Sequence, residues 1–163
     1  MLKLLVDGVQ SSLYELDATC FTKSYAAATT TSDRVKSTDV GVLAGTVAAY
    51  GTASYKVVPG TKTNRPVGLF LNNAQGAPFD NSAAVAANKI AIVRQMASVE
   101  VDVYETKSAS EVSTELSYAV GDKLYASANG LLTKEASTDG TVIGICTKIP
   151  TTASPFLGLD LCI

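Results

Sequence analysis

The clearest pattern of apolar and polar positions lies in the C-terminal third of the chain. Residues 118–127 form a short apolar run, and the pair Asn129-Gly130 follows it. Asparagine and glycine accept the positive φ angles that a two-residue type I′ turn requires, so this pair predicts a tight β-hairpin. Residues 131–133 are the expected return strand.

Two further apolar runs follow this hairpin. The turn residues at 138–140, Thr-Asp-Gly, lead into a run at 141–149, and two prolines separate that run from the last one, at 156–163. Asp160 should lie on the exposed face of the last run, because side chains alternate across a strand. The opposite face is expected to carry Leu157, Leu159, Leu161 and Ile163.

Alternation is strictest in the middle of the chain, between residues 99 and 105. The valines at 99, 101 and 103 share one predicted face, and Glu100, Asp102 and Tyr104 share the other. One face of this strand is therefore expected in the core and the other in water. Just before it, residues 89–94 predict a short and mostly buried strand.

Strand signals also occur earlier, at residues 40–50, 55–58 and 67–71. Pro59-Gly60 and Asn72-Asn73 supply turns between these runs. The whole chain then contains roughly eight to ten short strands and little helix, which is typical of all-β proteins. The predicted fold class is therefore all-β, a small antiparallel β-barrel or sandwich.

The order of these segments divides the chain into an arm and a body. Residues 1–39 are expected to form an extended N-terminal arm, with a first strand at 1–7 and a Thr/Ser/Ala-rich segment at 19–39. The alanines of that segment also suit a helix, but its threonines and its lack of an apolar stripe count against one. Residues 40–163 are expected to form the β domain and to fold without the arm.

Composition restricts the possible partners. The 163 residues are 47% hydrophobic and only 17% charged, with 13 basic and 15 acidic side chains. A surface with so little charge favours a protein that is covered by partners. No basic run points to nucleic acid as a partner, and the lack of tryptophan argues against stacking on single strands. The apolar runs are too short for a signal peptide or a membrane helix, so we expect a soluble protein made in a cytoplasm.

Three cysteines, Cys20, Cys146 and Cys162, are widely spaced and odd in number. They indicate neither a disulfide framework nor a zinc site. Cys146 and Cys162 lie in strand-like runs, where a buried free thiol that packs as a small apolar side chain is the expected state. A disulfide between subunits is the alternative.

Enzymatic chemistry has little support in the sequence. The chain has no histidine, which excludes Ser-His and Cys-His nucleophiles and imidazole metal sites. Glu100 and Asp102 share one strand face at about 6.5–7 Å, a spacing used by inverting glycosidases, but acidic residues on a wet strand face are usually plain surface. The glycines between 41 and 51 match no phosphate-binding loop, and no spaced acidic loop for calcium occurs. We expect no catalytic residues, no metal and no cofactor.

Lys56, Lys62 and Arg65 gather around Pro59, Gly60 and Pro66 in one predicted loop. A solvated turn is the simpler explanation. The alternative is a cationic loop that docks on an acidic protein shell. These three residues are the candidate contact site.

Four strings of the C-terminal half resemble the decoration, or cement, proteins of tailed-phage heads. They are Val-Gly-Asp-Lys-Leu-Tyr-Ala at 120–126, Asn-Gly-Leu-Leu-Thr at 129–133, Gly-Thr-Val-Ile-Gly-Ile-Cys at 140–146 and Phe-Leu-Gly-Leu-Asp-Leu at 156–161. The resemblance extends from about Arg65 onward and consists of turns and strand faces, with no chemical signature.

The resemblance implies a non-enzymatic virion protein. It would bind the major capsid protein on the outer capsid surface and stabilise the shell, as a homo-oligomer, with a trimer favoured and a dimer possible. The segment at 19–39, with the first strand before it, is expected to reach a neighbouring subunit and to order on assembly.

Two other classes of protein stay open. Another virion component, such as a tail-tube or fibre domain, would share the β content and the low charge. An enzyme or a carbohydrate-binding module would need a concave pocket with convergent polar groups.

Overall fold

The computed structural model describes residues 2–4, 11–16, 41–52, 56–72, 74–75, 89–95, 97–111 and 113–163. These residues contain thirteen strands and no helix, so the predicted all-β class is confirmed. The strands form a six-stranded sheet, a five-stranded closed barrel and a two-stranded ribbon. None of the described residues belongs to a helix that is long and apolar enough to span a membrane.

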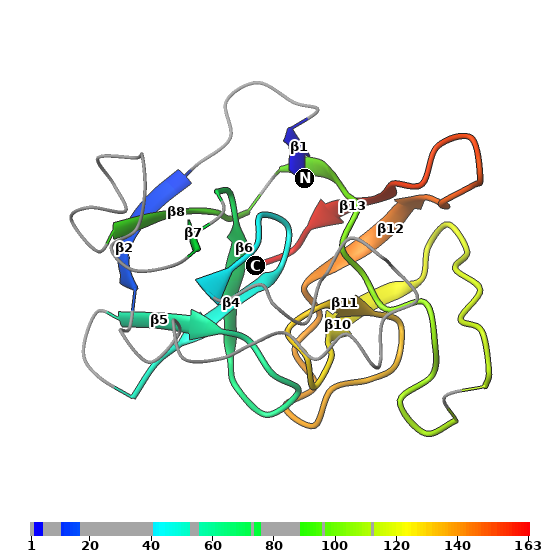
Figure 1. The fold of residues 1–163 in the computed structure, drawn as a ribbon, viewed down its shortest axis with the longest axis horizontal. Coiled ribbons are helices and arrows are strands. Elements are labelled where there is room, and N and C mark those ends of the chain that lie inside the picture. The colour runs from blue at the N-terminus through cyan, green and yellow to red at the C-terminus, as the bar shows by residue number, and fades with distance from the viewer. Residues whose placement is uncertain are drawn as a thin grey trace.

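The six-stranded sheet is antiparallel throughout and contains most of the C-terminal half. Its spatial order is β1-β9-β13-β12-β10-β11. The strands are β1 (Leu2–Leu4), β9 (Ser98–Val101), β10 (Lys123–Ala126), β11 (Leu132–Thr133), β12 (Gly144–Lys148) and β13 (Leu157–Leu161). Figure 1 shows β10 to β13 together at one end of the molecule.

The predicted faces of β13 are confirmed. Leu157, Leu159 and Leu161 are buried, and Asp160 between them is exposed. The hydroxyl of Ser98 on β9 donates a hydrogen bond to the Asp160 carboxylate. The strand therefore has a core face and a wet face, as its alternation predicts.

The alternation around β9 is confirmed for the valines but is wrong for Tyr104. Val99, Val101 and Val103 are buried, whereas Glu100 and Asp102 are half-buried. β9 ends at Val101, and Tyr104 bridges to Leu132 beyond it, so its ring is buried instead of wet. The phase of the alternation is lost where the strand ends.

The β10–β11 hairpin exists, but its turn is not the predicted type I′. Only Gly130 has a positive φ, 78°, whereas a type I′ turn needs one at Asn129 as well. Gly130 donates to the carbonyl of Ser127, and Ser127 donates to that of Leu131, so the loop has three residues. The Ser127 hydroxyl also accepts from the backbone amides of Asn129 and Leu131. This side-chain capping favours the longer loop with glycine in its last position.

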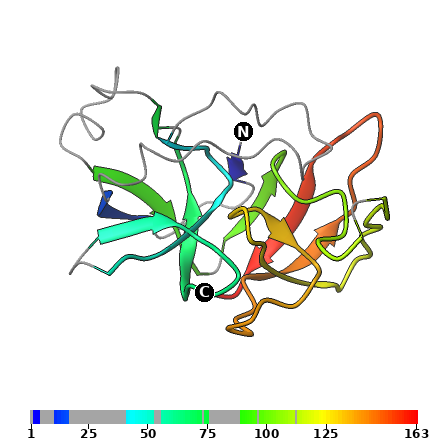
Figure 2. The same cartoon turned by 60° about the horizontal axis from the view of Figure 1, so that its bottom comes forward.

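The barrel is formed by strands from the N-terminal half. Its closed order is β2-β5-β4-β6-β8. The strands are β2 (Ser11–Leu16), β4 (Val47–Tyr50), β5 (Lys56–Pro59), β6 (Pro66–Phe70) and β8 (Lys89–Val93). β2 pairs with β8 antiparallel and with β5 parallel, so this one strand closes the ring. Figures 1 and 2 show the barrel at the end of the molecule opposite β10 to β13.

The apolar run at residues 40–50 contains two strands and a turn. β3 (Gly41–Val42) pairs with β7 (Ala74–Gln75), and β4 begins at Val47. Between them, Gly45 has a φ of 90°, and a Cβ on it would lie 3.1 Å from Val103 Cγ2. Glycine thus allows both the turn and the close approach of the chain after β9.

Both strands of the N-terminal segment pair with the rest of the chain. The predicted first strand is confirmed as β1, an edge strand on β9, and β2 belongs to the barrel. The segment at 19–39 lies outside the described residues. The division at residues 39 and 40 stays a prediction, with strands on both sides of it in shared sheets.

Candidate functional site

The structure distributes the three predicted contact residues over different surroundings. Lys62 and Arg65 are exposed between β5 and β6, whereas Lys56 is half-buried on β5. Lys62 lines a hollow that also contains Glu105, and Arg65 lines a separate cleft. The three cations therefore do not converge on one point.

Arg65 shares its cleft with a second guanidinium group, that of Arg94. The cleft has a volume of about 500 Å³, and Tyr50 and Thr141 are among its lining residues. Arg94 lies directly after β8 and donates from Nη1 to the hydroxyl of Tyr14 at 2.8 Å. Its Nε is buried and has no hydrogen-bond partner within the described part of the chain. Two guanidinium groups in one polar cleft form a surface that suits an anion.

Asp139 is an acidic neighbour of Arg65. Partial burial raises the pKa of its carboxyl, but hydrogen bonds from Thr141 and Ser137, with the charge of Arg65, outweigh this and lower the pKa below its ordinary value. Asp139 Oδ1 accepts from Ser137 Oγ at 2.9 Å and from the Thr141 amide at 3.2 Å. Asp139 therefore stays ionised near the cleft and neutralises part of its positive charge.

Arg94 was not predicted as a site residue. It is the last residue of the strand predicted at 89–94, directly after the apolar residues of β8, so the sequence indicates no role for it beyond the end of a strand. β8 pairs with β6, and the backbone amide of Gln95 donates a hydrogen bond to the carbonyl of Ile163. These contacts position Arg94 in the cleft that Arg65 also lines. No local pattern in the sequence indicates that neighbourhood.

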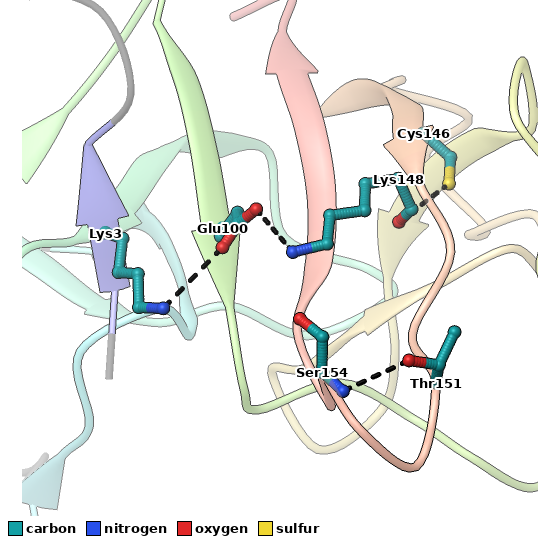
Figure 3. A network of polar contacts seen from close by, with 6 residues as sticks. All are labelled: Lys3, Glu100, Cys146, Lys148, Thr151 and Ser154. Carbon is teal, nitrogen blue, oxygen red and sulfur yellow. Dashed lines mark hydrogen bonds and ion pairs between the residues drawn. The ribbon is translucent and has the colours of Figure 1, made fainter.

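The carboxylate pair at Glu100 and Asp102 contains one side chain held by two lysines. Glu100 Oε1 accepts from Lys148 Nζ at 2.6 Å, and Glu100 Oε2 lies 3.8 Å from Lys3 Nζ. Figure 3 shows Glu100 between the two lysines, which come from β12 and β1. Lys3 Nζ also lies 3.8 Å from the ring centre of Phe156. The arrangement ties neighbouring strands of the sheet together, and its half-exposed lysines limit its contribution to stability.

Glu105 is a buried carboxyl group at the end of the alternating run that the sequence predicts between residues 99 and 105. Its side chain is only 5% exposed. Its Oε1 accepts hydrogen bonds from Ser127 Oγ at 2.7 Å and from Asn129 Nδ2 at 2.9 Å, whereas Oε2 is buried without a partner among the described residues. Residue 105 has the same parity as the three core valines, but the alternation is already lost at Tyr104, so the burial of Glu105 does not follow from that pattern.

Burial also changes the acidity of Glu105. Desolvation raises the pKa of its carboxyl above the ordinary 4.5, although the hydrogen bonds from Asn129 and Ser127 lower it in part, and the charge of Glu135 raises it further. Glu135 itself accepts from the Ser108 hydroxyl at 2.5 Å and from the Ala109 amide at 2.9 Å. The two carboxyl groups thus lie at one end of the molecule in different environments.

The cysteines differ in burial. Cys146 is buried, as predicted, and desolvation raises the pKa of its thiol. The same prediction is wrong for Cys162, which follows β13 and is exposed, because the alternation places it opposite Leu161. Cys20 lies outside the described residues.

Among the residues described, no three or more histidine, cysteine, aspartate or glutamate side chains are grouped so that they could hold a metal ion. Comparisons with protein-family models, curated proteins and solved structures found no match for this chain. The arrangement of its own residues is therefore the basis for a functional proposal.

Proposed function

We propose that this chain is a structural protein that binds the outer surface of a tailed-phage capsid and stabilises it. One observation carries the proposal beyond the resemblance of short strings. The four strings include β10, β11, β12 and β13, and these strands are adjacent in one sheet, in the order β13-β12-β10-β11. The four strings thus belong to one continuous part of the sheet. This is expected if the chain and the decoration proteins that it resembles have the same type of domain.

The proposed mechanism is adhesion without a chemical step. A protein that binds two neighbouring capsid subunits adds binding free energy that must be lost before the subunits separate. Many copies act on one shell, so a modest affinity at each site is sufficient.

The cleft with Arg65 and Arg94 is the proposed contact with the major capsid protein. An aspartate or glutamate side chain of the capsid would pair with Arg65, which is exposed, in the cleft that Arg94 also lines. Charge pairs of this kind contribute both specificity and association rate. Lys62 lies in the same β5–β6 connection and would add a longer-range attraction.

Exposed apolar side chains support the proposal that copies of the chain associate with one another. Val120 is 69% exposed and Ile149 is 45% exposed. The resemblance favours a trimer over a dimer. Sedimentation at micromolar concentration is expected to show an oligomer, and a monomer at all concentrations would contradict this part of the proposal.

The contact is tested by charge reversal. Arg65→Glu is expected to weaken binding to undecorated capsids at least about tenfold, which corresponds to about 1.4 kcal/mol. Lys123→Glu is the matched control, since it makes the same charge change at an exposed position on β10 outside the cleft. Equal binding by the two variants would exclude the cleft as the contact.

The reinforcing role needs a separate measurement. Capsids decorated with the native protein are expected to open at a higher temperature than bare capsids, and capsids mixed with Arg65→Glu should behave like bare ones. Equal opening temperatures for decorated and bare capsids would contradict the stabilising function. Immunogold labelling along the tail instead of the head would favour the tail-tube or fibre alternative.

A further inference from the structure

A second hollow brings together an amine, a carboxyl group and a carboxamide. It has a volume of about 210 Å³ and is lined by Lys62, Lys107, Glu105 and Asn129, together with small side chains. Ser108, Ala109, Ser127 and Ala128 complete the lining. Of these groups, the proposed capsid contact uses only Lys62, so the set of Lys107, Glu105 and Asn129 is independent of that proposal.

We propose that Lys107 and Asn129 form an intramolecular isopeptide bond in this hollow, with Glu105 as the group that transfers the proton. The Nζ of Lys107 attacks the Cγ of Asn129, so that an Nζ–Cγ bond forms and the Cγ–Nδ2 bond breaks. Ammonia leaves with a proton that originates on the lysine amine. The exchange of one amide for another is redox-neutral and needs no co-reactant.

The contacts of Glu105 suit a proton carrier in this reaction. Its Oε1 already accepts a hydrogen bond from Asn129 Nδ2 at 2.9 Å, and Nδ2 is the nitrogen that must be protonated in order to leave. Its Oε2 is buried and makes no hydrogen bond to any residue that the structure describes, so it retains the capacity to take a proton from the lysine. Burial raises the pKa of Glu105 above the ordinary 4.5, which makes the protonated carboxyl group more available as a proton donor.

The backbone around the three groups is fixed by hydrogen bonds. The amide of Glu105 donates to the carbonyl of Leu132 at 2.8 Å, which attaches the segment after β9 to β11. The Ser127 hydroxyl binds Glu105 and also caps the turn that contains Asn129. Groups held in one place react as if at a very high local concentration, which is what a slow amide exchange requires.

Lys107 is the assigned nucleophile because of its position relative to Glu105. Lys107 lines the same hollow as the buried carboxyl group of Glu105. Lys107 is half-buried, whereas Lys62 is exposed. A lysine that is partly withdrawn from water has less side-chain freedom to lose when it is held in position for attack.

One competing reaction has the same change in mass. The amide nitrogen of Gly130 can attack the Cγ of Asn129 and form a succinimide, which also releases one ammonia. The experiment must therefore identify the peptides that become joined and not only the mass that is lost.

The test is mass spectrometry of the purified full chain after incubation at neutral pH. The native protein is expected to lose the mass of one ammonia, and its tryptic digest should contain the peptides of Lys107 and Asn129 joined together, resistant to mild base. An unchanged intact mass would overturn the proposal. A loss that mild base converts to aspartate or isoaspartate would assign the reaction to the succinimide and would overturn it as well.

Three variants and one control assign the roles. Lys107→Arg and Asn129→Ala should abolish the joined peptide, and Glu105→Gln should reduce its rate of formation at least about a hundredfold, the lower end of general acid–base contributions. Lys62→Arg is the control and should leave the link intact. Circular dichroism of Lys107→Arg, a substitution at a half-buried site, verifies that the fold persists without the bond. A link that survives Lys107→Arg, or one that Lys62→Arg abolishes, would contradict the assignment.

Discussion

The six-stranded sheet and the closed barrel are built from the same kind of strand but from different kinds of connection. In the sheet, β10 pairs with β11 and β12 with β13, each with the next strand along the chain. In the barrel, the closing strand β2 pairs with β8 and β5, which lie far away in the sequence. The β10–β11 and β12–β13 pairs of the sheet are thus local, whereas its β1–β9 pair and the closure of the barrel by β2 depend on distant pairing.

This difference determines how far each region is readable from its sequence. A turn signal between two apolar runs identifies a local hairpin, because the turn itself sets the pairing. A strand that pairs across more than seventy residues carries no such signal, since its partner is selected by the closure of the ring. Distant pairing also costs more loop-closure entropy before it yields contacts.

The two regions nevertheless share part of one core. Val47, Leu69 and Val93 of the barrel strands belong to the same buried cluster as the valines and leucines of β9 and β13. A separate cluster fills the barrel, with Phe70, Ile90 and Ile92 among its members. The comparison therefore predicts two regions of different local stability that are coupled through a common interface.

The largest expected effect comes from removing residues 1–39. The sequence predicts that the β domain survives this truncation, but the structure changes the expected result. The barrel loses β2 and with it the closure between β5 and β8, whereas the sheet loses only its edge strand β1. Native-state hydrogen exchange should show protection lost in β8 and retained in β12 and β13. Equal loss in all three strands would show that the two regions are one cooperative unit.

A substitution at Leu159 probes the sheet side of the comparison. Leu159 is fully buried and belongs to the shared core, so Leu159→Ala is expected to lower the free energy of unfolding by about 2–5 kcal/mol. Asp160→Ala, one residue along on the exposed face, should lower it by less than about 1 kcal/mol. Denaturant unfolding measures both. Similar losses for the two variants would contradict the register assigned to β13.

The smallest expected effect is a dependence of stability on pH that originates at Glu105. Because its pKa is raised in the folded state, the native protein binds the proton more tightly than the unfolded chain. Its contribution to stability is therefore greatest below pH 4.5, the ordinary pKa, and declines as pH rises through the folded value. Glu105→Gln should remove this decline.

The pH experiment is best made in a Lys107→Arg background, so that the proposed isopeptide bond does not contribute. Glu111→Gln, at an exposed position, is the control and should leave the pH profile unchanged. Parallel profiles for the Glu105 variant and its parent would show that the buried carboxyl group is not coupled to unfolding.

Local chemistry by itself determined the all-β class, the hairpins of the C-terminal half and the two faces of β13. Each of these follows from side-chain alternation or from a turn whose residues are adjacent in the chain.

Only the tertiary structure decided the closure of the barrel and the cleft that Arg65 and Arg94 both line. The same is true of the hollow lined by Lys107, Asn129 and Glu105. The tertiary structure also separated Lys62 from Arg65, although they are three residues apart in the chain. These neighbourhoods join side chains from strands and turns that are distant in sequence. Their partners are selected by the packing of whole sheets, which no local pattern of residues encodes.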